Sequence, residues 1–166
     1  MANSEPEVIY EDEAVLVINK PAGMVVNRAQ SVKGETVQDW AEKRSGMLVH
    51  RLDKETSGVM VIAKTPEVLA ALQRQFKGRK VAKKYIAMVY GKLEPKAGVI
   101  AVPVGRSQQN RSKFTVTAGG KAAETEYRVK RYYPGYTQVE VWPRTGRTHQ
   151  IRVHLAYMGH PGVGDE

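Results

Sequence analysis

The strongest candidate for chemistry in this chain is a short polar segment at residues 50–58, with the sequence HRLDKETSG. It places the carboxylate of Asp53 in a loop directly before the apolar run 59–63. Loops held by rigid elements are where reactive side chains usually lie, and an ionised carboxylate there can act as a nucleophile or a base. The simpler alternative is a turn in which Asp53, Thr56 and Ser57 only satisfy backbone groups.

The order His-Arg-Leu-Asp also invites comparison with the catalytic loop of protein kinases. A kinase needs His-Arg-Asp together with a glycine-rich phosphate loop, and this sequence has neither. We therefore exclude a kinase.

A second polar segment covers residues 144–155, with the sequence RTGRTHQIRVHL. The glycine predicts a turn, and Thr148 predicts the N-cap of a helix. Arg147 then lies at a helix N-terminus, where the helix dipole disfavours a cation unless a carboxylate is near. An exposed arginine with no role remains the alternative.

Metal binding is not expected at this segment. His149 and His154 are five residues apart, which separates them by about 140° around a helix, unlike the same-face spacing of zinc-binding helices. The chain has no cysteine, and no third ligand accompanies the two histidines. We predict no metal site in this segment.

The elements that must position these segments follow from apolar patterning and from glycine and proline. Five strands are expected, at residues 14–20, 59–63, 84–90, 98–105 and 122–132, and a sixth at 136–142 after a turn at Pro134-Gly135. Three helices are expected, at residues 36–44, from the Thr65 cap to Gly78, and at 148–158 with Gly159 as its stop. Helices among mostly sequential strands predict an α+β fold with a mixed, mostly antiparallel sheet and flanking helices.

Length and charge limit the partner and the compartment. The 166 residues fit one domain, and the net charge of +9 indicates a polyanion partner. From Arg74 to Lys92 the chain carries seven basic residues and no acid, whereas its beginning is acidic. No apolar run is long enough to span a membrane, and the polar start (residues 1–6) lacks the order of a signal peptide. We predict a cytoplasmic monomer that binds nucleic acid and no membrane.

The end of the chain has no closing element. Residues 159–166 (GHPGVGDE) form a turn-rich loop, whereas a domain normally ends on a packed strand or helix. We therefore expect the domain at residues 1–166 to be incomplete at its C-terminus.

Taken together, these motifs resemble the RluA-type RNA pseudouridine synthases. Residues 50–58 resemble the catalytic motif of that family, and residues 19–23 (NKPAG), 84–91 (KYIAMVYG) and 144–155 match further motifs in the same order. The closing residues 159–165 resemble another one, although Gly162 stands where a larger apolar residue is expected. The resemblance covers the chain from Val8 onward.

The resemblance implies a pseudouridine synthase fold with a central catalytic cleft, and isomerisation of uridine to pseudouridine in RNA without cofactor or metal. Asp53 matches the catalytic aspartate, Tyr85 the tyrosine that stacks on the target base, and Arg147 the arginine paired with the catalytic carboxylate. Arg51 matches an arginine that can fill the place of the flipped nucleotide. The small N-terminal RNA-binding module of some members is not expected here.

Further contacts to ribosomal or transfer RNA are expected from residues around these motifs. They are His50, Arg79, Lys80, Lys83, Lys84, Arg106, Arg144 and Ile151, together with Arg111 and Lys113 as phosphate contacts. Two other readings stay open: a non-catalytic RNA-binding domain that keeps the synthase fold, and a basic protein with another acidic partner.

Overall fold

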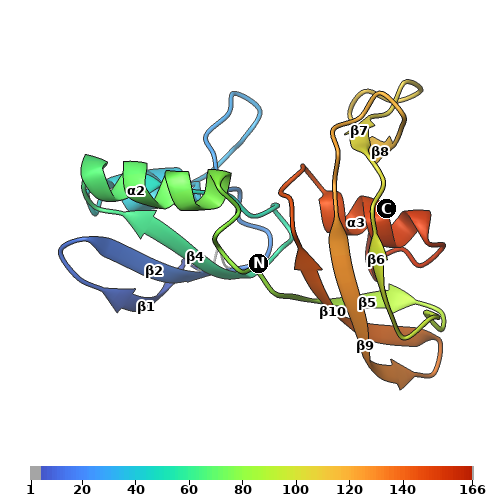
Figure 1. The fold of residues 1–166 in the computed structure, drawn as a ribbon. Coiled ribbons are helices and arrows are strands. Elements are labelled where there is room, and N and C mark those ends of the chain that lie inside the picture. Colours follow the sequence, from blue (N-terminus) through green and yellow to red (C-terminus); the bar gives the residue numbers. More distant parts are fainter. Residues whose placement is uncertain (1–4, 166) are drawn as a thin grey trace. The chain divides into compact units, whose positions relative to one another are not determined.

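The computed structural model describes residues 5–165 and divides the chain into two compact units, of which the first ends at Lys80 and the second begins at Val81 (Figure 1). Residues 1–4, on which part of the signal-peptide prediction depends, lie outside the described residues. That the two units together form the single domain expected from the sequence stays a prediction.

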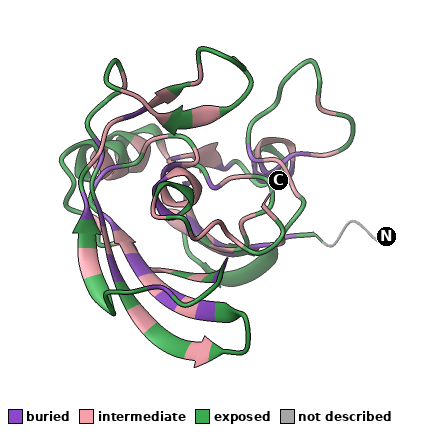
Figure 2. Ribbon diagram, turned by 90° about the vertical axis from the view of Figure 1, so that its right-hand side faces the viewer, coloured by how far each residue is buried: buried purple, intermediate pink, exposed green. Residues whose placement is uncertain are grey.

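The first unit contains a four-stranded antiparallel sheet in the order β1-β2-β4-β3. Its strands are β1 (Glu7–Glu11), β2 (Val15–Lys20), β3 (Met47–Leu48) and β4 (Gly58–Ala63). Leu16 and Ile18 from β2 and Met60 and Ile62 from β4 are fully buried on one face of this sheet. The strands alternate between buried and more exposed residues, as expected for a sheet with one covered face. Figure 2 shows a similar alternation on the long strands of the second unit.

Two helices complete the first unit, α1 (Val37–Glu42) and α2 (Pro66–Lys77). Thr65 caps α2 and Pro66 is its first residue, as the sequence predicted. The helix ends at Lys77, directly before the predicted stop at Gly78. The residue with left-handed backbone after it is Arg79, with φ of 57°, and not Gly78. The amides of Gly78, Arg79 and Lys80 then close the end of the helix on carbonyls of its last turn.

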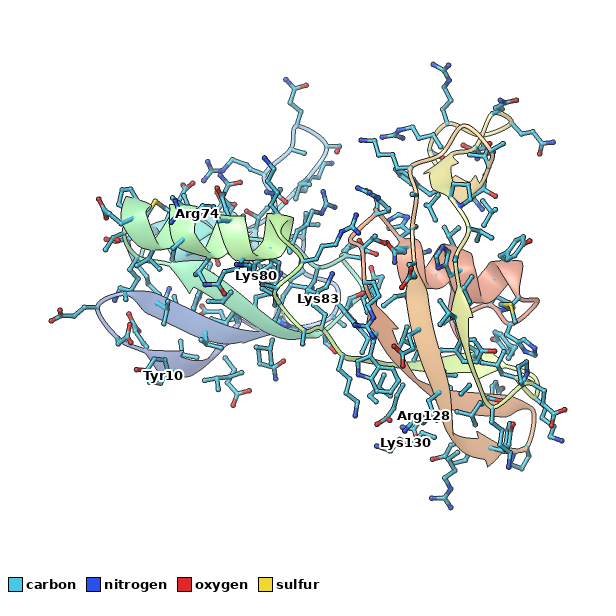
Figure 3. The ribbon with its side chains drawn as sticks, viewed as in Figure 1. Tyr10, Arg74, Lys80, Lys83, Arg128 and Lys130 are labelled. Carbon is cyan, nitrogen blue, oxygen red and sulfur yellow. The ribbon has the colours of Figure 1, made fainter. Side chains whose placement is uncertain are left out.

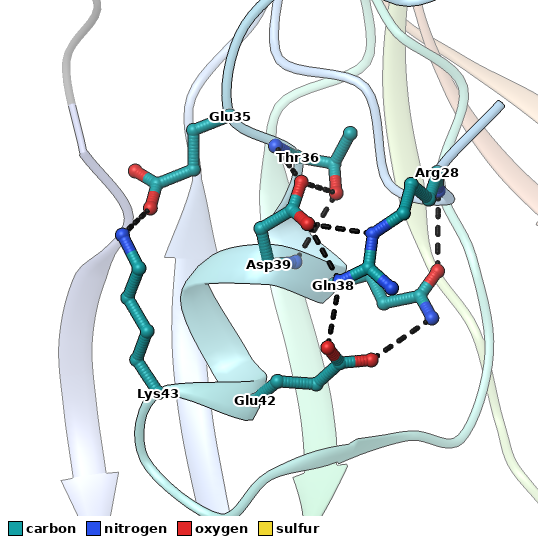
Figure 4. A network of polar contacts seen from close by, with 7 residues as sticks. All are labelled: Arg28, Glu35, Thr36, Gln38, Asp39, Glu42 and Lys43. Carbon is teal, nitrogen blue, oxygen red and sulfur yellow. Dashed lines mark hydrogen bonds and ion pairs between the residues drawn. The ribbon is translucent and has the colours of Figure 1, made fainter. Parts of the chain in front are cut away.

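A network of charged side chains fixes α1 and the loop before it (Figure 4). Thr36 and Asp39 form a reciprocal capping box, and Arg28 donates from the loop to Asp39 and Glu42. Hydrogen bonds from the side chain and amide of Thr36, and then from Arg28, lower the pKa of Asp39 to about 2. The cap therefore stays charged, and so intact, well below neutral pH.

The second unit is built on a four-stranded antiparallel sheet in the order β5-β10-β9-β6. The strands are β5 (Tyr85–Tyr90), β6 (Ala97–Ile100), β9 (Thr125–Tyr133) and β10 (Tyr136–Pro143), and a separate hairpin consists of β7 (Val104–Arg106) and β8 (Phe114–Val116). Helix α3 (Gln150–Tyr157) packs against β8, β9 and β10.

One face of this sheet carries the core of the second unit. Val89, Tyr127, Val139 and Val141 are buried there, and Leu155 joins them from α3. The register shifts in β9, where Lys130 is an extra residue between the pairs Val139–Val129 and Gln138–Arg131. Such a bulge exchanges the faces of every later residue in the strand.

The α+β prediction is confirmed, and every strand pair among the described residues is antiparallel. The strand expected at 98–105 is wrong in one respect, since it is interrupted between Ile100 and Val104, where Pro103 lacks an amide for a sheet ladder. Strands β1, β3 and β8 were not foreseen. No helix among the described residues is long and apolar enough to cross a membrane.

Candidate active site

Asp53 lies in the connection between β3 and β4, two neighbouring strands of the first sheet. The carbonyl of Asp53 accepts from the Thr56 amide at 3.1 Å, which closes a turn. Leu52 beside it is buried and anchors the loop to the core. A backbone turn therefore exists here, whereas the simpler alternative, in which the side chains of this loop only satisfy backbone groups, stays open.

His50 holds the start of this loop in place. Its Nε2 accepts from the Val61 amide at 3.2 Å, and its ring stacks on Phe76 of α2 with 4.5 Å between centroids. The acceptor role requires an unprotonated Nε2. The imidazole therefore positions the loop against both β4 and α2, whatever contact it makes with a substrate.

A fully buried lysine lies beneath the same loop. Lys20 ends β2 on the covered face of the sheet, and its Nζ donates to the carbonyls of Pro21 at 2.7 Å, Met24 at 2.8 Å and Lys54 at 3.0 Å. The Lys54 carbonyl also accepts from the Gly23 amide at 2.9 Å. One ammonium thus joins residues 21–24 to the residue that follows Asp53.

Two nearby carboxylates partly offset the effect of burial on the Lys20 ammonium. Burial lowers the pKa of its ammonium, and the carboxylates of Glu55 and then Asp53 oppose that shift. Asp53 is therefore within electrostatic range of a buried cation. Lys20 was not among the predicted site residues, although its position after Leu16 and Ile18 on the inward-facing side of β2 is a signal that could have identified it.

The segment around Arg147 is positioned by Gln150, which is almost fully buried. The side-chain oxygen of Gln150 accepts from the Arg147 amide at 3.0 Å and from the Thr145 hydroxyl at 2.6 Å. Its nitrogen donates to the Glu124 carbonyl and to the Thr125 hydroxyl, both at 2.9 Å. All four hydrogen-bonding positions of the amide are therefore used.

This chain of hydrogen bonds continues to His154 and has a single direction. The carbonyl of Val102 can only accept, so His154 Nε2 carries the proton at 3.0 Å from it. Nδ1 must then accept from the Thr125 hydroxyl at 2.8 Å. Burial lowers the pKa of His154, and the bond to Val102 partly opposes this. A neutral imidazole therefore completes the network, and His154 has a structural role.

The predicted start of the last helix is wrong by two residues. α3 begins at Gln150, and its N-cap is His149, which has φ of 54° and makes no capping hydrogen bond with its side chain. Thr148 is therefore not the cap. Arg147 lies before the helix, and its Nε donates to the Ala122 carbonyl at 3.1 Å.

Tyr85 begins β5 and lies on a segment next to Arg147. Lys83 connects the two segments, because its Nζ donates to the Thr145 carbonyl at 3.0 Å. Tyr85 is half-buried and packs on the core of the second unit, as does Ile151 of α3. Lys84 forms an ion pair with Glu140 at 2.6 Å, which reduces the charge available to a phosphate.

The remaining predicted RNA contacts lie at scattered places. Arg51 is exposed beside Asp53, and Arg79 and Lys80 are exposed after α2. In the second unit Arg144 pairs with Glu126 at 2.8 Å. Arg106 lies over the ring of Phe114, whose edge meets His149. The expected residues thus divide between the two units, with Asp53 and Arg51 in the first and Tyr85 and Arg147 in the second.

No group of three or more histidine, aspartate or glutamate side chains within residues 5–165 is placed to hold a metal ion. The motifs instead agree with a family model described as RNA pseudouridylate synthase, which matches residues 14–157. The chain belongs to this family.

Curated relatives are consistent with this membership. The chain is 43% identical over 169 residues to ribosomal large subunit pseudouridine synthase D of Pseudomonas aeruginosa, a match that covers 97% of this chain and 52% of the relative. It is also 43% identical over 172 residues to an uncharacterized RNA pseudouridine synthase of Aquifex aeolicus, covering 95% and 54%. The chain therefore spans about half the length of the curated relatives it matches.

Solved structures of family members are also similar. Human RNA pseudouridylate synthase domain containing 1 superposes with a TM-score of 0.83 at 29% identity, covering 97% of this chain and 68% of that one. Human RNA pseudouridylate synthase domain containing 4 gives a TM-score of 0.79 at 31% identity, covering 96% and 67%.

The role of Lys20 can be tested by removing its ammonium. Lys20→Met should lower the free energy of unfolding by about 3 kcal/mol, because three carbonyls lose their bond to a buried ammonium. The Gly23 amide should also exchange its hydrogen faster, since the Lys54 carbonyl that binds it is released. Chemical denaturation and hydrogen exchange measure both. Lys54→Met, at an exposed neighbour, is the control and should change stability by less than about 0.5 kcal/mol; equal effects of the two variants would contradict the role.

The buried state of His154 predicts a dependence of stability on pH. Because its folded pKa is lowered, the unfolded state binds the proton more readily, so its contribution is complete above about pH 6.5 and is lost as the pH falls towards the folded pKa. Denaturation at pH 7.5 and 5.5 should show this loss in the natural chain and a smaller one in His154→Leu. Leu155→Ala, the control, should lower stability equally at both values. An unchanged pH dependence in His154→Leu would show that another group is responsible.

Proposed function

We propose that this chain is the catalytic domain of an RNA pseudouridine synthase, which isomerises specific uridines of structured RNA to pseudouridine. The observation that carries the proposal is the family match over residues 14–157, which includes Asp53, Tyr85 and Arg147. Relatives named for the large ribosomal subunit support ribosomal RNA as the substrate, and transfer RNA is the other candidate. The domain works as a monomer without metal or cofactor.

The reaction needs one carboxylate. The bond from ribose C1′ to uracil N1 breaks, the base turns, C1′ joins C5, and the proton of C5 leaves while N1 gains one. Asp53 attacks the sugar or the base, or stabilises and deprotonates a cationic sugar. A glycosidase uses two carboxylates because it handles water and a departing group. Here the base is retained, so a single one is sufficient provided that water is excluded.

Arg147 is proposed to keep the catalytic carboxylate ionised. A guanidinium beside a carboxylate stabilises its charged form, which desolvation by a bound base would otherwise disfavour. The family resemblance supports this partner. The hydrogen bonds from the Arg147 amide and Nε support a fixed backbone and side chain from which it acts.

Tyr85 is proposed to stack on the extruded uracil. Its place at the start of β5, on a segment tied by Lys83 to the Arg147 segment, supports a shared role of the two side chains. The nucleotide must leave its stack at a cost of a few kcal/mol, and Arg51 offsets part of this by filling the vacated place. Exposed cations such as Arg79, Lys80 and Arg106 hold phosphates.

The central test is the release of tritium from RNA that carries 5-tritiated uridine. Asp53→Ala should release none above background while RNA binding is largely kept, because only the nucleophile is lost. Glu55→Ala is the matched control: it removes an exposed carboxylate from the same loop and should remain active. Release by Asp53→Ala would refute the assignment, and no release by the natural chain with RNA binding retained would favour a non-catalytic RNA-binding domain.

Variants of Tyr85 separate stacking from proton transfer. Tyr85→Phe keeps the aromatic face, so KM for RNA should stay within about twofold of the natural value. Tyr85→Leu removes it and should weaken binding of the substrate by about 1–3 kcal/mol, or roughly 5- to 150-fold. Steady-state tritium release measures both constants. A complete loss of kcat in Tyr85→Phe would assign the C5 proton to the phenol instead.

A further inference from the structure

The second sheet has an outer face that no helix of its unit covers. The core and α3 pack on the face that carries Val89, Val139 and Val141. Residues that alternate with these in β5, β9 and β10 point the opposite way. This outer face is defined by Lys84, Ile86, Met88, Tyr90, Glu126, Arg128, Lys130, Arg131, Tyr133, Tyr136, Gln138, Glu140 and Trp142.

Three tyrosines form a row across the outer face. Tyr136 of β10 pairs in register with Tyr90 of β5 on one side and with Tyr133 of β9 on the other. The rings of Tyr90 and Tyr136 lie 5.5 Å apart at an angle of 44°. The exposed fractions of Tyr90, Tyr136 and Tyr133 are 46%, 40% and 38%. Aromatic surface is therefore offered to a partner along three adjacent strands.

Cations flank this row of tyrosines. Arg128 and Lys130 extend from β9 (Figure 3), and Arg131 lies over the ring of Tyr133 at 5.1 Å. Glu140 is already engaged by Lys84 and Lys130, at 2.6 and 3.6 Å. Arg128 and Arg131 form no ion pair with any residue in the described part of the chain. The face therefore has an excess of positive charge next to its aromatic rings.

We propose that this outer face binds a single-stranded segment of RNA, with bases stacked on the tyrosine row and phosphates held by Arg128 and Arg131. Aromatic rings and guanidinium planes stack on unpaired bases, whereas the bases of a duplex keep their faces within the helix. The apolar residues of this face, Ile86 and Met88, lie among cations, and cations match the phosphates of RNA. Charge complementarity therefore favours RNA over a protein surface as the occupant. The inference rests on the proposed function in that RNA is the partner, but it uses none of the proposed catalytic residues.

The test is the binding of a fluorescein-labelled 12-nucleotide oligouridylate, compared with an RNA duplex of the same length. Tyr136→Leu should bind the oligouridylate about tenfold more weakly, whereas Tyr136→Phe should bind it as the natural chain does. Tyr157→Leu is the aromatic control, since Tyr157 is 58% exposed on α3, which packs on the other face. Circular dichroism confirms that each variant is folded.

The salt dependence gives a second and independent measurement. Arg128→Gln combined with Arg131→Gln should reduce the slope of log K against log salt by about 1.4, because each lost phosphate contact on a single strand contributes about 0.7. Tyr136→Leu should weaken binding without changing that slope. Lys33→Gln, at an exposed lysine in the first unit, is the charge control and should change neither quantity.

The outcomes separate this inference from the proposed function. Unchanged affinity in both the tyrosine and the arginine variants would overturn the inference, even if tritium release by the natural chain upholds the enzyme. Weaker binding of the oligouridylate in these variants would support the inference even if no tritium is released. If the variants differ from the natural chain in sedimentation coefficient but not in RNA affinity, the face is a protein interface. This result would also overturn the inference.

Discussion

In the second unit, the segment that carries Arg147 depends on one buried side-chain amide. Gln150 binds the Arg147 amide, the Thr145 hydroxyl, the Glu124 carbonyl and the Thr125 hydroxyl, and so joins α3 to the strand ends around it. A buried polar group without partners is costly, so this network tolerates few arrangements. The position of Arg147 is therefore set by a neutral, uncharged framework, with His154 as its last member.

In the first unit, the loop that carries Asp53 is held by a charged group instead. Lys20 supplies three hydrogen bonds from one ammonium to the carbonyls of Pro21, Met24 and Lys54, the last of which also accepts from the Gly23 amide. A buried cation is tolerated only where oxygen atoms surround it, and the nearby carboxylates of Glu55 and Asp53 add to that. The loop that carries Asp53 is thus held from below, while His50 holds it from the side through β4 and α2.

Much of the fold could be predicted because its signals are local. Thr65 followed by Pro66 identified the start of α2, and Pro134-Gly135 identified the turn between β9 and β10. The features that were missed have separate explanations. Thr148 is a residue type that often caps helices. In this chain the side chain of Gln150, the first residue of α3, accepts from the Arg147 amide instead. Strand β1 was not predicted because all five of its residues are exposed, so its sequence lacks the apolar alternation that indicates a strand.

The site residues proposed from the sequence stay predictions. Asp53, Tyr85 and Arg147 stand out because their types and neighbours match motifs, and the roles proposed for them come from that resemblance. Lys20 and Gln150 lie within segments that match motifs, but the resemblance gave neither a role, and lysine and glutamine are common surface residues. Their importance follows only from burial, which arises when segments far apart in the chain pack together.

The bulge at Lys130 has a consequence for how this chain can vary. The extra residue places Tyr132 inward, where its hydroxyl reaches the Leu93 carbonyl, and Tyr133 outward beside Tyr136. A substitution in this part of β9 changes one side chain, whereas the loss or gain of a single residue would exchange the faces of both tyrosines at once. The hairpin of β9 and β10 is therefore constrained in its length more strongly than in its composition.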